Sequence, residues 1–224
     1  MTQQKHPHKL FVFDWNGTLL ADTAASWKAS NICLNFYGAP SISLARFRET
    51  FNFPVLKFYE DNGVPAEKVL ERKDEGNHVF QSSYERLAAK ARTRRGSRVL
   101  LEHLKTENYT LIFLSNAITE KIDAHLDRLG LHGYFEEING HDCDGTTILQ
   151  STTKTLRLRE YMAKYNVDAA HTSIIGDSME EPEIAHALGI KSYSITGGGV
   201  STPRLKSARP NVIVNSLPQV IKHL

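Results

Sequence analysis

The segment FVFDWNGTLL, residues 11–20, sets the interpretation of the whole sequence. Its first three residues are aromatic or β-branched, and such residues favour a β-strand. The strand runs directly into Asp14, and Gly17 follows in a turn where glycine permits a tight backbone conformation. The polar residue two places after the acid, Asn16, is an amide rather than a second acid. The segment predicts a buried strand whose end carries a functional carboxylate.

Apolar runs of similar composition recur along the chain. They are rich in Val, Ile and Phe without clean alternation, which is typical of parallel strands buried on both faces. The expected strands are residues 10–13, 110–115, 172–177, 191–196 and, more weakly, 211–215. Segments with apolar residues at helical spacing lie at residues 97–107, 120–130, 155–166 and 181–189. Strands that alternate with helices predict an α/β fold with a doubly wound, Rossmann-like parallel sheet.

Residues 21–93 break this alternation, because they contain several helical segments and no convincing strand. A helical block after the first strand predicts a smaller, all-helical cap domain inserted into the α/β core. We therefore expect residues 1–20 and 94–224 to form the core and residues 21–93 to form the cap. The basic run ARTRRGSR, residues 91–98, is interpreted as a solvated link back to the core, with a phosphate or nucleic-acid patch as the alternative.

The composition of the 224 residues is that of an ordinary globular protein, with 41% hydrophobic and 23% charged residues. A formal net charge of +2 gives no argument for nucleic acid or an acidic membrane surface. No apolar run approaches the roughly 18 residues of a membrane span, and the N-terminus lacks the apolar core of a signal peptide. Two distant cysteines, Cys33 and Cys143, do not predict a disulfide scaffold. We expect a cytoplasmic protein, as a monomer or a homodimer.

Polar side chains follow the predicted strands at one edge of the sheet, where open parallel sheets bind their ligands. These residues are Asp14 after the first strand, Ser115 and Asn116 after the second, Asp177 after the third, and Lys154 at the start of the preceding helix. Acids in this arrangement can hold a hard divalent cation through oxygen atoms. The hydroxyl, the ammonium and turn backbone N–H groups can hold a phosphate, and Asp14 would lie where a carboxylate can attack phosphorus.

Four segments resemble, in order, the four motifs of the haloacid dehalogenase superfamily. FDWNGTLL is similar to the first motif, whose usual form is an Asp, any residue, an Asp, Gly-Thr and a hydrophobic pair. LIFLSNA resembles the second, Lys154 in STTKTLRLREYM fits the third, and IIGDSMEEPEIAHALG resembles the fourth, with Glu181 as its second acid. The resemblance covers nearly the whole chain and implies a hydrolase with a helical cap, similar to phosphoglycolate phosphatases.

The resemblance implies a metal-dependent nucleophilic mechanism. Asp14 would be the nucleophile that forms an aspartyl-phosphate. Asp14, the backbone carbonyl of Asn16 and Asp177 would hold Mg²⁺, and Glu181 would help directly or through water.

The same resemblance implies that Ser115, Asn116 and Lys154 bind the phosphate, and that the charge of Lys154 offsets the charge of the transition state. The cap segment FRETFNFPVLKFYEDNG, residues 47–63, contains Arg48 and Lys57, which are weaker candidates for substrate contacts. The expected substrate is a small phosphorylated metabolite, and phosphoglycolate-like compounds follow by family analogy alone.

Asn16 departs from the family pattern. Phosphatases of the family carry an Asp there that protonates the leaving oxygen and then activates water, and its loss puts a factor of about 10² to 10⁴ in rate at stake. Three hypotheses follow: a slow phosphatase, a phosphonate hydrolase, or a binding protein without turnover. The phosphonate branch carries Asp-Trp-Ala-Gly-Thr in the first motif and needs a cap lysine that forms an imine, for which Lys28 and Lys57 are the candidates.

Overall fold

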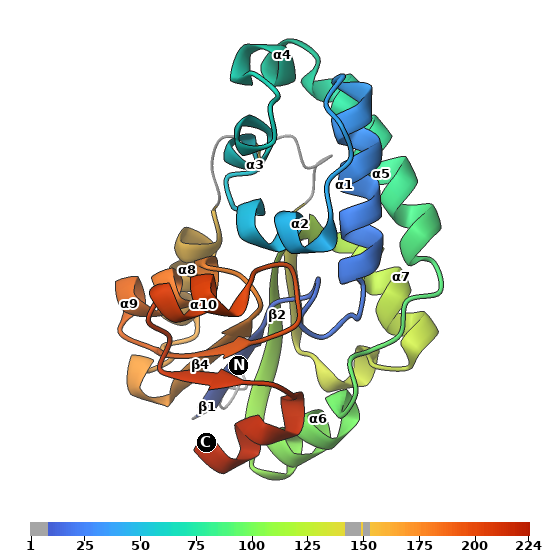
Figure 1. Cartoon of the computed structure of the whole chain (residues 1–224). Coiled ribbons are helices and arrows are strands. Elements are labelled where there is room, and N and C mark those ends of the chain that lie inside the picture. Colours follow the sequence, from blue (N-terminus) through green and yellow to red (C-terminus); the bar gives the residue numbers. More distant parts are fainter. Residues whose placement is uncertain (1–8, 142–148, 150–152) are drawn as a thin grey trace.

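A single parallel sheet lies at the centre of the molecule (Figure 1). The computed structural model describes residues 9–141, 149 and 153–224. Within them the strand order is β3-β2-β1-β4-β5-β6, which confirms the predicted doubly wound α/β fold. The strands are β1 (Lys9–Phe13), β2 (Tyr109–Ile118), β3 (Glu137–His141), β4 (Thr172–Gly176), β5 (Lys191–Ile195) and β6 (Val212–Val214).

Helices cover both faces of the sheet, because the strands are apolar on both faces. One face packs against α6 (Ser97–Thr106), α7 (Thr119–Leu129) and the 3-10 helix η4 (Leu217–His223). The other face packs against α8 (Lys154–Lys164) and α9 (Glu180–Leu188). The four helices predicted between the later strands are therefore present. Short helices complete the core: η1 (His132–Tyr134), η3 (Ala169–His171) and α10 (Thr202–Ser207).

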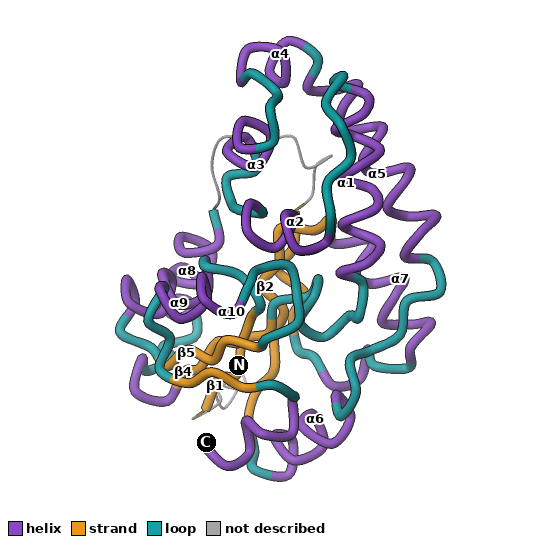
Figure 2. Tube along the Cα trace, viewed as in Figure 1, coloured by secondary structure: helices purple, strands orange, loops and turns teal. Residues whose placement is uncertain are grey.

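Helices joined by short turns form a second body of structure, above the carboxyl end of the sheet in Figures 1 and 2. They are α1 (Thr23–Phe36), α2 (Leu44–Thr50), α3 (Leu56–Asp61), α4 (Ala66–Glu71) and α5 (Lys73–Ala88). The long helices α1 and α5 pack along each other. This segment has its own apolar cluster, which includes Cys33, Phe47, Phe58 and Val69. The cluster is separate from the two clusters on the faces of the sheet.

Besides the 3-10 helices, one strand and one α-helix of the core were not predicted, and in both the sequence signal is weak. β3, the edge strand EINGH, contains only one apolar residue, Ile138. Helix α10 is six residues long, and Leu205 is its buried residue. Among the described residues, none of the helices combines the length and apolar composition of a membrane span.

Candidate active site

The candidate catalytic side chains lie where the order of the strands reverses. The chain places β2 on one side of β1 and β4 on the other, which is the point where doubly wound sheets bind ligands. Phe13 pairs with Phe113 of β2 and Ile175 of β4. Asp14 directly follows Phe13. Ser115 lies two places after Phe113, and Asp177 lies two places after Ile175. The parallel register therefore brings these three motif residues together.

Lys154 is the centre of a buried ion cluster. Its side chain is 2% exposed, and its Nζ lies 2.8 Å from Asp14 Oδ1 and 2.9 Å from Glu181 Oε1. Glu180 Oε2 is also within 3.2 Å of this ammonium. Burial opposes the charge of Lys154, but the attraction of the three carboxylates outweighs it and raises the pKa of Lys154 well above its ordinary value. Lys154 is therefore a permanent cation beside the Asp14 carboxylate.

Asp14 and Asp177 share one hydroxyl partner. Thr18 Oγ1 lies 3.2 Å from Asp14 Oδ2 and 3.2 Å from Asp177 Oδ1, and one hydroxyl proton can be donated to only one of them at a time. Burial raises the pKa of Asp14 well above its ordinary value, against the opposing effect of Lys154. Burial likewise raises the pKa of Asp177 to about 6. Two desolvated carboxylates that face each other are stabilised by a cation.

The residues at this point fit Mg²⁺ bound by two protein carboxylates. Among the described residues, no group of three or more His, Cys, Asp or Glu side chains is arranged to hold a metal ion by itself. Mg²⁺ in phosphate-handling sites characteristically uses one or two carboxylates and completes its shell with water and substrate oxygens. Both carboxylate oxygens of Glu181 have other partners, since Oε1 accepts from Lys154 and Oε2 accepts from the Ser178 hydroxyl at 2.8 Å.

Glycine backbones enclose the Asp177 carboxylate. Gly17 has a φ of +67°, and a Cβ atom built on it would lie 2.2 Å from Asp177 Oδ2. A Cβ atom on Gly198 would lie 2.1 Å from the same oxygen, and the backbone N–H of Gly199 donates to it. Residues 197–199 belong to the loop that follows β5. In the structure, this loop positions a candidate metal ligand.

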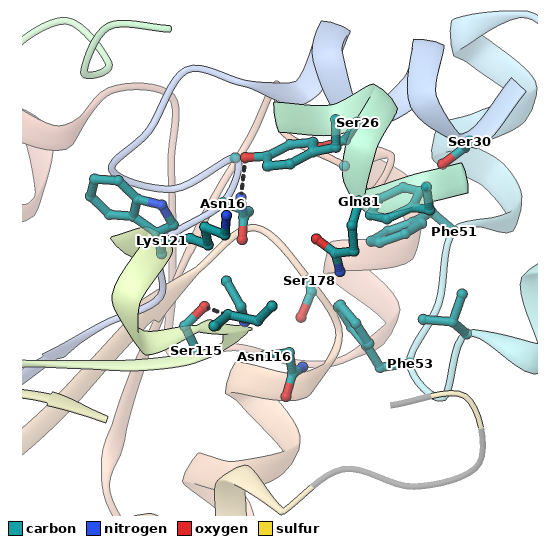
Figure 3. A pocket seen from close by; sticks show the side chains of 18 of the residues that line it. Asn16, Ser26, Ser30, Phe51, Phe53, Gln81, Ser115, Asn116, Lys121 and Ser178 are labelled. Atoms are coloured by element: carbon teal, nitrogen blue, oxygen red, sulfur yellow. Dashed lines mark hydrogen bonds between the residues drawn. The ribbon is translucent and has the colours of Figure 1, made fainter. Parts of the chain in front are cut away.

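The side chain of Asn16 belongs to a hydrogen-bond network around a second buried acid, Asp22. Asn16 Nδ2 donates to Asp22 Oδ2 at 2.8 Å and to the Tyr84 hydroxyl at 2.7 Å, a contact drawn in Figure 3. The Tyr84 hydroxyl donates to Asp22 Oδ2 at 2.6 Å, and the backbone N–H of Gly17 donates to Asp22 Oδ1 at 2.6 Å. Asp22 is 1% exposed. The amide thus supplies a donor that an ionised carboxylate at residue 16 could not supply.

The second motif is also buried at the site. Ser115 is 1% exposed, and its hydroxyl accepts from the backbone N–H of Ala117 at 3.1 Å. Asn116 Nδ2 donates to Glu180 Oε2 at 2.8 Å. The buried Asn116 Oδ1 has no hydrogen-bond partner among the residues that the structure describes. Both side chains lie at the cavity that Asp14 and Lys154 also line (Figure 3).

The structure does not bring the predicted cap contacts into the cavity. Arg48 Nε donates to the Gly198 carbonyl at 2.9 Å, so its guanidinium is used to link α2 to the glycine loop. Lys57 is exposed and pairs with Asp61 one helical turn away. Lys28 is exposed as well. None of the three lysine and arginine candidates lines the cavity beside Asp14.

The interpretation of the basic run as a solvated link is wrong for Arg94. Its side chain donates to the carbonyls of Gly17 at 2.7 Å and Thr196 at 2.6 Å. Burial lowers the pKa of Arg94 from its ordinary value. Arg94 therefore joins the turn after β1 to the loop after β5. The composition of the run gives no sign that this guanidinium binds backbone carbonyls of the core.

A cavity of about 380 Å³ extends from Asp14 into the helical segment. From the core, it is lined by the polar residues Asn16, Ser115, Lys154 and Asp177 and by apolar residues that include Trp15 and Ile122. From the helical segment, it is lined by aromatic rings of α2, α3, α5, the loop after α2 and the residue that follows α1: Tyr37, Phe47, Phe51, Phe53, Phe58, Tyr59, Phe80 and Tyr84. Sequence reasoning missed the cavity residues of α5, because their distance from the motifs in the chain gives no signal.

Two relatives of known sequence that match nearly the whole chain are named as phosphatases. The chain is similar to "Probable phosphatase IndB" of Dickeya dadantii, with 26% identity over 216 residues, 95% of this chain and 91% of that protein. It is 23% identical to a phosphoglycolate phosphatase of Aliivibrio fischeri over 222 residues, 92% of this chain and 91% of that protein.

Solved structures of similar fold span nearly the full length. A hydrolase from Pseudomonas syringae superposes with a TM-score of 0.74 at 18% identity, over 96% of this chain and 97% of that one. A haloacid dehalogenase-like family hydrolase from Streptococcus pneumoniae gives 0.71 at 21% identity, over 96% and 97%. These identities establish the fold alone. The family model described as haloacid dehalogenase-like hydrolase matches residues 11–195. The chain therefore belongs to the haloacid dehalogenase-like hydrolase family.

Proposed function

We propose that this hydrolase is a Mg²⁺-dependent phosphohydrolase that acts on a small phosphorylated metabolite through an aspartyl-phosphate on Asp14. The observation that carries the proposal is the buried contact of 2.8 Å between Asp14 Oδ1 and Lys154 Nζ at the reversal point of the sheet. A carboxylate held beside a fixed cation there can attack a phosphoryl group whose charge the cation offsets. Relatives named as phosphatases support the same chemistry.

Each side chain then has a defined task. The Asp14 carboxylate attacks phosphorus, the bond from phosphorus to the leaving oxygen breaks, and the leaving alkoxide takes a proton from water. A second water then cleaves the aspartyl-phosphate, which releases phosphate and restores Asp14. Lys154 binds the phosphoryl oxygens, together with the hydroxyl of Ser115 and the amide of Asn116. Asp14, Asp177 and the backbone carbonyl of Asn16 would hold Mg²⁺, with Glu181 acting through water.

When bound, Mg²⁺ would neutralise the charge of the phosphate and of the carboxylates that surround it. We further propose that residues 21–93 act as a cap on a core formed by residues 1–20 and 94–224. Their helices supply one wall of the cavity, and a wall of this kind keeps bulk water from the reacting groups.

We propose that turnover is slow on esters with poor leaving groups, because Asn16 cannot transfer a proton. The amide nitrogen of Asn16 donates its hydrogen bonds to Asp22 and Tyr84 instead. The alternative of phosphonate hydrolysis needs a lysine that reaches the substrate carbonyl. The two lysines predicted for that role, Lys28 and Lys57, are not among the residues that line the cavity, whereas Lys73 and Lys121 are. Phosphonate hydrolysis therefore stays the alternative that the substrate panel decides.

A substrate panel tests this function. The protein with Mg²⁺ is incubated with ethyl phosphate, 2-phosphoglycolate and phosphonoacetaldehyde, and released phosphate is measured with and without EDTA. We expect release from at least one ester, loss of release with EDTA, and no release by the Asp14→Asn variant. Release from phosphonoacetaldehyde alone would favour the phosphonate hydrolase. Tight binding of an ester without release would favour the binding protein. Release that survives Asp14→Asn would contradict the proposed nucleophile.

A further inference from the structure

We propose, on the basis of the phosphohydrolase function above, that the organic part of the substrate is a flat aromatic or heteroaromatic ring. The observation is the composition of the cavity beyond Asp14, where eight aromatic rings of the helical segment line the wall that faces the polar site. A short carboxylic acid such as that of phosphoglycolate would leave this wall without a partner.

The size of the cavity supports a larger substrate than a two-carbon ester. At about 380 Å³ it lies within the range of roughly 300–1,000 Å³ typical of pockets that enclose drug-sized ligands. The phosphoryl group would occupy the end between Asp14 and Ser115. The remaining volume extends toward Phe47, Phe51 and Phe58, which belong to the interior of the helical segment.

The rings in the wall already contact one another in the geometries that aromatic groups prefer. Phe47 and Phe51 are stacked, with centroids 4.9 Å apart, and Phe51 meets Phe53 edge to face at 5.3 Å. On α5, Phe80 and Tyr84 are stacked with an interplanar angle of 9°. A flat ring that enters between these groups can add offset-stacked and edge contacts to both sets. An aliphatic or charged group would add neither.

The cations at the cavity are poorly placed for a second negative charge on the substrate. Lys154 is held by three carboxylates, and Lys121 pairs with Glu85 at 2.7 Å. Arg128 donates to the Ala91 carbonyl at 2.6 Å. Lys73 is exposed, at the first residue of α5. Apart from Lys73, these cations are already engaged by other groups, so a substrate carboxylate among the aromatic rings that does not reach Lys73 would be desolvated without a partner, which is costly.

One amide in the wall is suited to the polar edge of a ring. Gln81 lines the cavity, and the hydrogen bonds among the described residues include none from its side chain. Figure 3 shows its amide end directed into the cavity, with Phe51 and Phe53 on the same side. An amide offers one acceptor and two donors. It can pair with a ring that carries a neighbouring donor and acceptor, as a nucleobase does.

The direct test compares esters with matched leaving groups. Ethyl phosphate and 2-phenylethyl phosphate both release a primary alcohol. The difference between their kcat/KM values therefore reflects the phenyl ring and not the reactivity of the ester bond. We expect kcat/KM for the phenyl ester to be about 10- to 100-fold higher, as expected for the burial of one phenyl ring. The variant Phe53→Ala should reduce this preference. The variant Phe36→Ala should retain it, because Phe36 packs in the same helical segment but does not line the cavity.

Gln81→Leu tests the polar edge separately. The variant should lower kcat/KM for uridine 5′-phosphate by about 10-fold or more, because the ring edge is then buried unpaired, and should leave 2-phenylethyl phosphate within a factor of about three. Equal losses for both esters would overturn the assignment of Gln81.

The failure of the ring proposal is distinguishable from failure of the phosphohydrolase. Hydrolysis of ethyl and 2-phenylethyl phosphate with equal kcat/KM, or a preference for 2-phosphoglycolate, would overturn the ring proposal and leave the hydrolase intact. If no ester is hydrolysed, the phosphohydrolase fails, and calorimetry with Mg²⁺ decides the ring proposal. A Kd at least about 10-fold lower for the phenyl ester would support it, and equal values would overturn it.

Discussion

Asn16 is the residue at which stability and proton transfer oppose each other. Its amide donates two hydrogen bonds, one of them to the buried carboxylate of Asp22. An aspartate at this position would face Asp22 at the same distance, and two carboxylates so close share a proton rather than ionise together. The same proton would make a good general acid. In the proposed mechanism, Asn16 therefore stabilises the turn and supplies no acid–base catalysis.

The substitution Asn16→Asp should therefore change activity and stability in opposite directions. The rate of hydrolysis of esters with poor leaving groups should rise by about 10²-fold over most of the pH range, because an acid is restored. The free energy of unfolding at pH 8 should fall by about 1–3 kcal/mol. Esters with good leaving groups should gain much less. Rates and urea denaturation measure the two effects.

A second substitution provides the control for this prediction. Adding Asp22→Asn to Asn16→Asp restores one amide and one carboxylate, so the stability should return toward that of the parent. The unfolding free energy of the single variant should also increase as the pH falls from 8 to 5, because the folded state takes up a proton that the unfolded state does not. Mass spectrometry of the Asn16–Gly17 peptide must accompany the kinetics to exclude deamidation. No change in rate with a verified Asn16→Asp protein would contradict the missing-acid argument.

Lys154 holds together the most highly charged part of the interior. Its replacement by Met would leave the buried carboxylates of Asp14 and Glu181 without their cation, and such a loss costs about 3–5 kcal/mol. The loss should be greatest at pH 8 and smaller at pH 5, because Lys154 lowers the pKa of Glu181 and its removal favours the protonated form. The matched control is Lys164→Met, at an exposed lysine of the same helix. Equal denaturation midpoints for both variants would refute the structural role of Lys154.

At the scale of elements, the loop after β5 and the turn after β1 act together. Arg94 joins their carbonyls, and Asp177 lies between the backbones of Gly17 and Gly198. A methyl group added at Gly17 or Gly198 would meet the Asp177 side chain, which would have to shift. The position of Asp177 therefore depends on the backbones of these two glycines.

The substitution Gly198→Ala tests this dependence. Its Cβ would lie 2.1 Å from Asp177 Oδ2, so we expect the Mg²⁺ concentration for half-maximal activity to rise by about 10- to 100-fold. Gly133→Ala is the control, because nothing lies within 4 Å of a Cβ built there. A normal Mg²⁺ response of Gly198→Ala would show that Asp177 is not held in the way described.

The strand-end residues could be predicted because parallel strands bring their carboxyl ends to one edge. Asp14, Ser115 and Asp177 follow directly from that rule, and Lys154 follows from its place before β4. The rule gives no information on how helices outside the sheet are oriented. Tyr84 and Gln81 lie on α5, far from the motifs in the chain, and the contact of Tyr84 with Asn16 depends on the packing of α1 against α5.

At the scale of the whole molecule, the core and the helical segment supply different parts of one cavity. The core supplies charge and the helical segment supplies aromatic surface. Arg48 and Lys57 are not among the residues that line the cavity, and charge in a segment does not show which way its helices face. Arg48 instead contacts Gly197 and Gly198 across the two bodies of structure.

Metal binding should be visible in the stability of the whole chain. A ligand that binds only the folded state raises the melting temperature, and Mg²⁺ also relieves the repulsion between Asp14 and Asp177. We expect Mg²⁺ to raise the melting temperature of the parent protein, and Asp177→Ala to abolish the shift. Ser201→Ala, outside the site, should retain it. A shift that persists in Asp177→Ala would place the ion elsewhere.

The most direct test of the central claim is the chemical state of Asp14 during turnover. The protein is mixed with Mg²⁺ and a phosphate ester, quenched in acid within the first turnovers, and analysed by peptide mass spectrometry. We expect one phosphoryl group on the peptide that contains Asp14, lost on treatment with hydroxylamine and absent from Asp14→Asn. This group should persist longer in the parent than in Asn16→Asp. Phosphate release with a phosphoryl group on another residue would show that Asp14 is not the nucleophile.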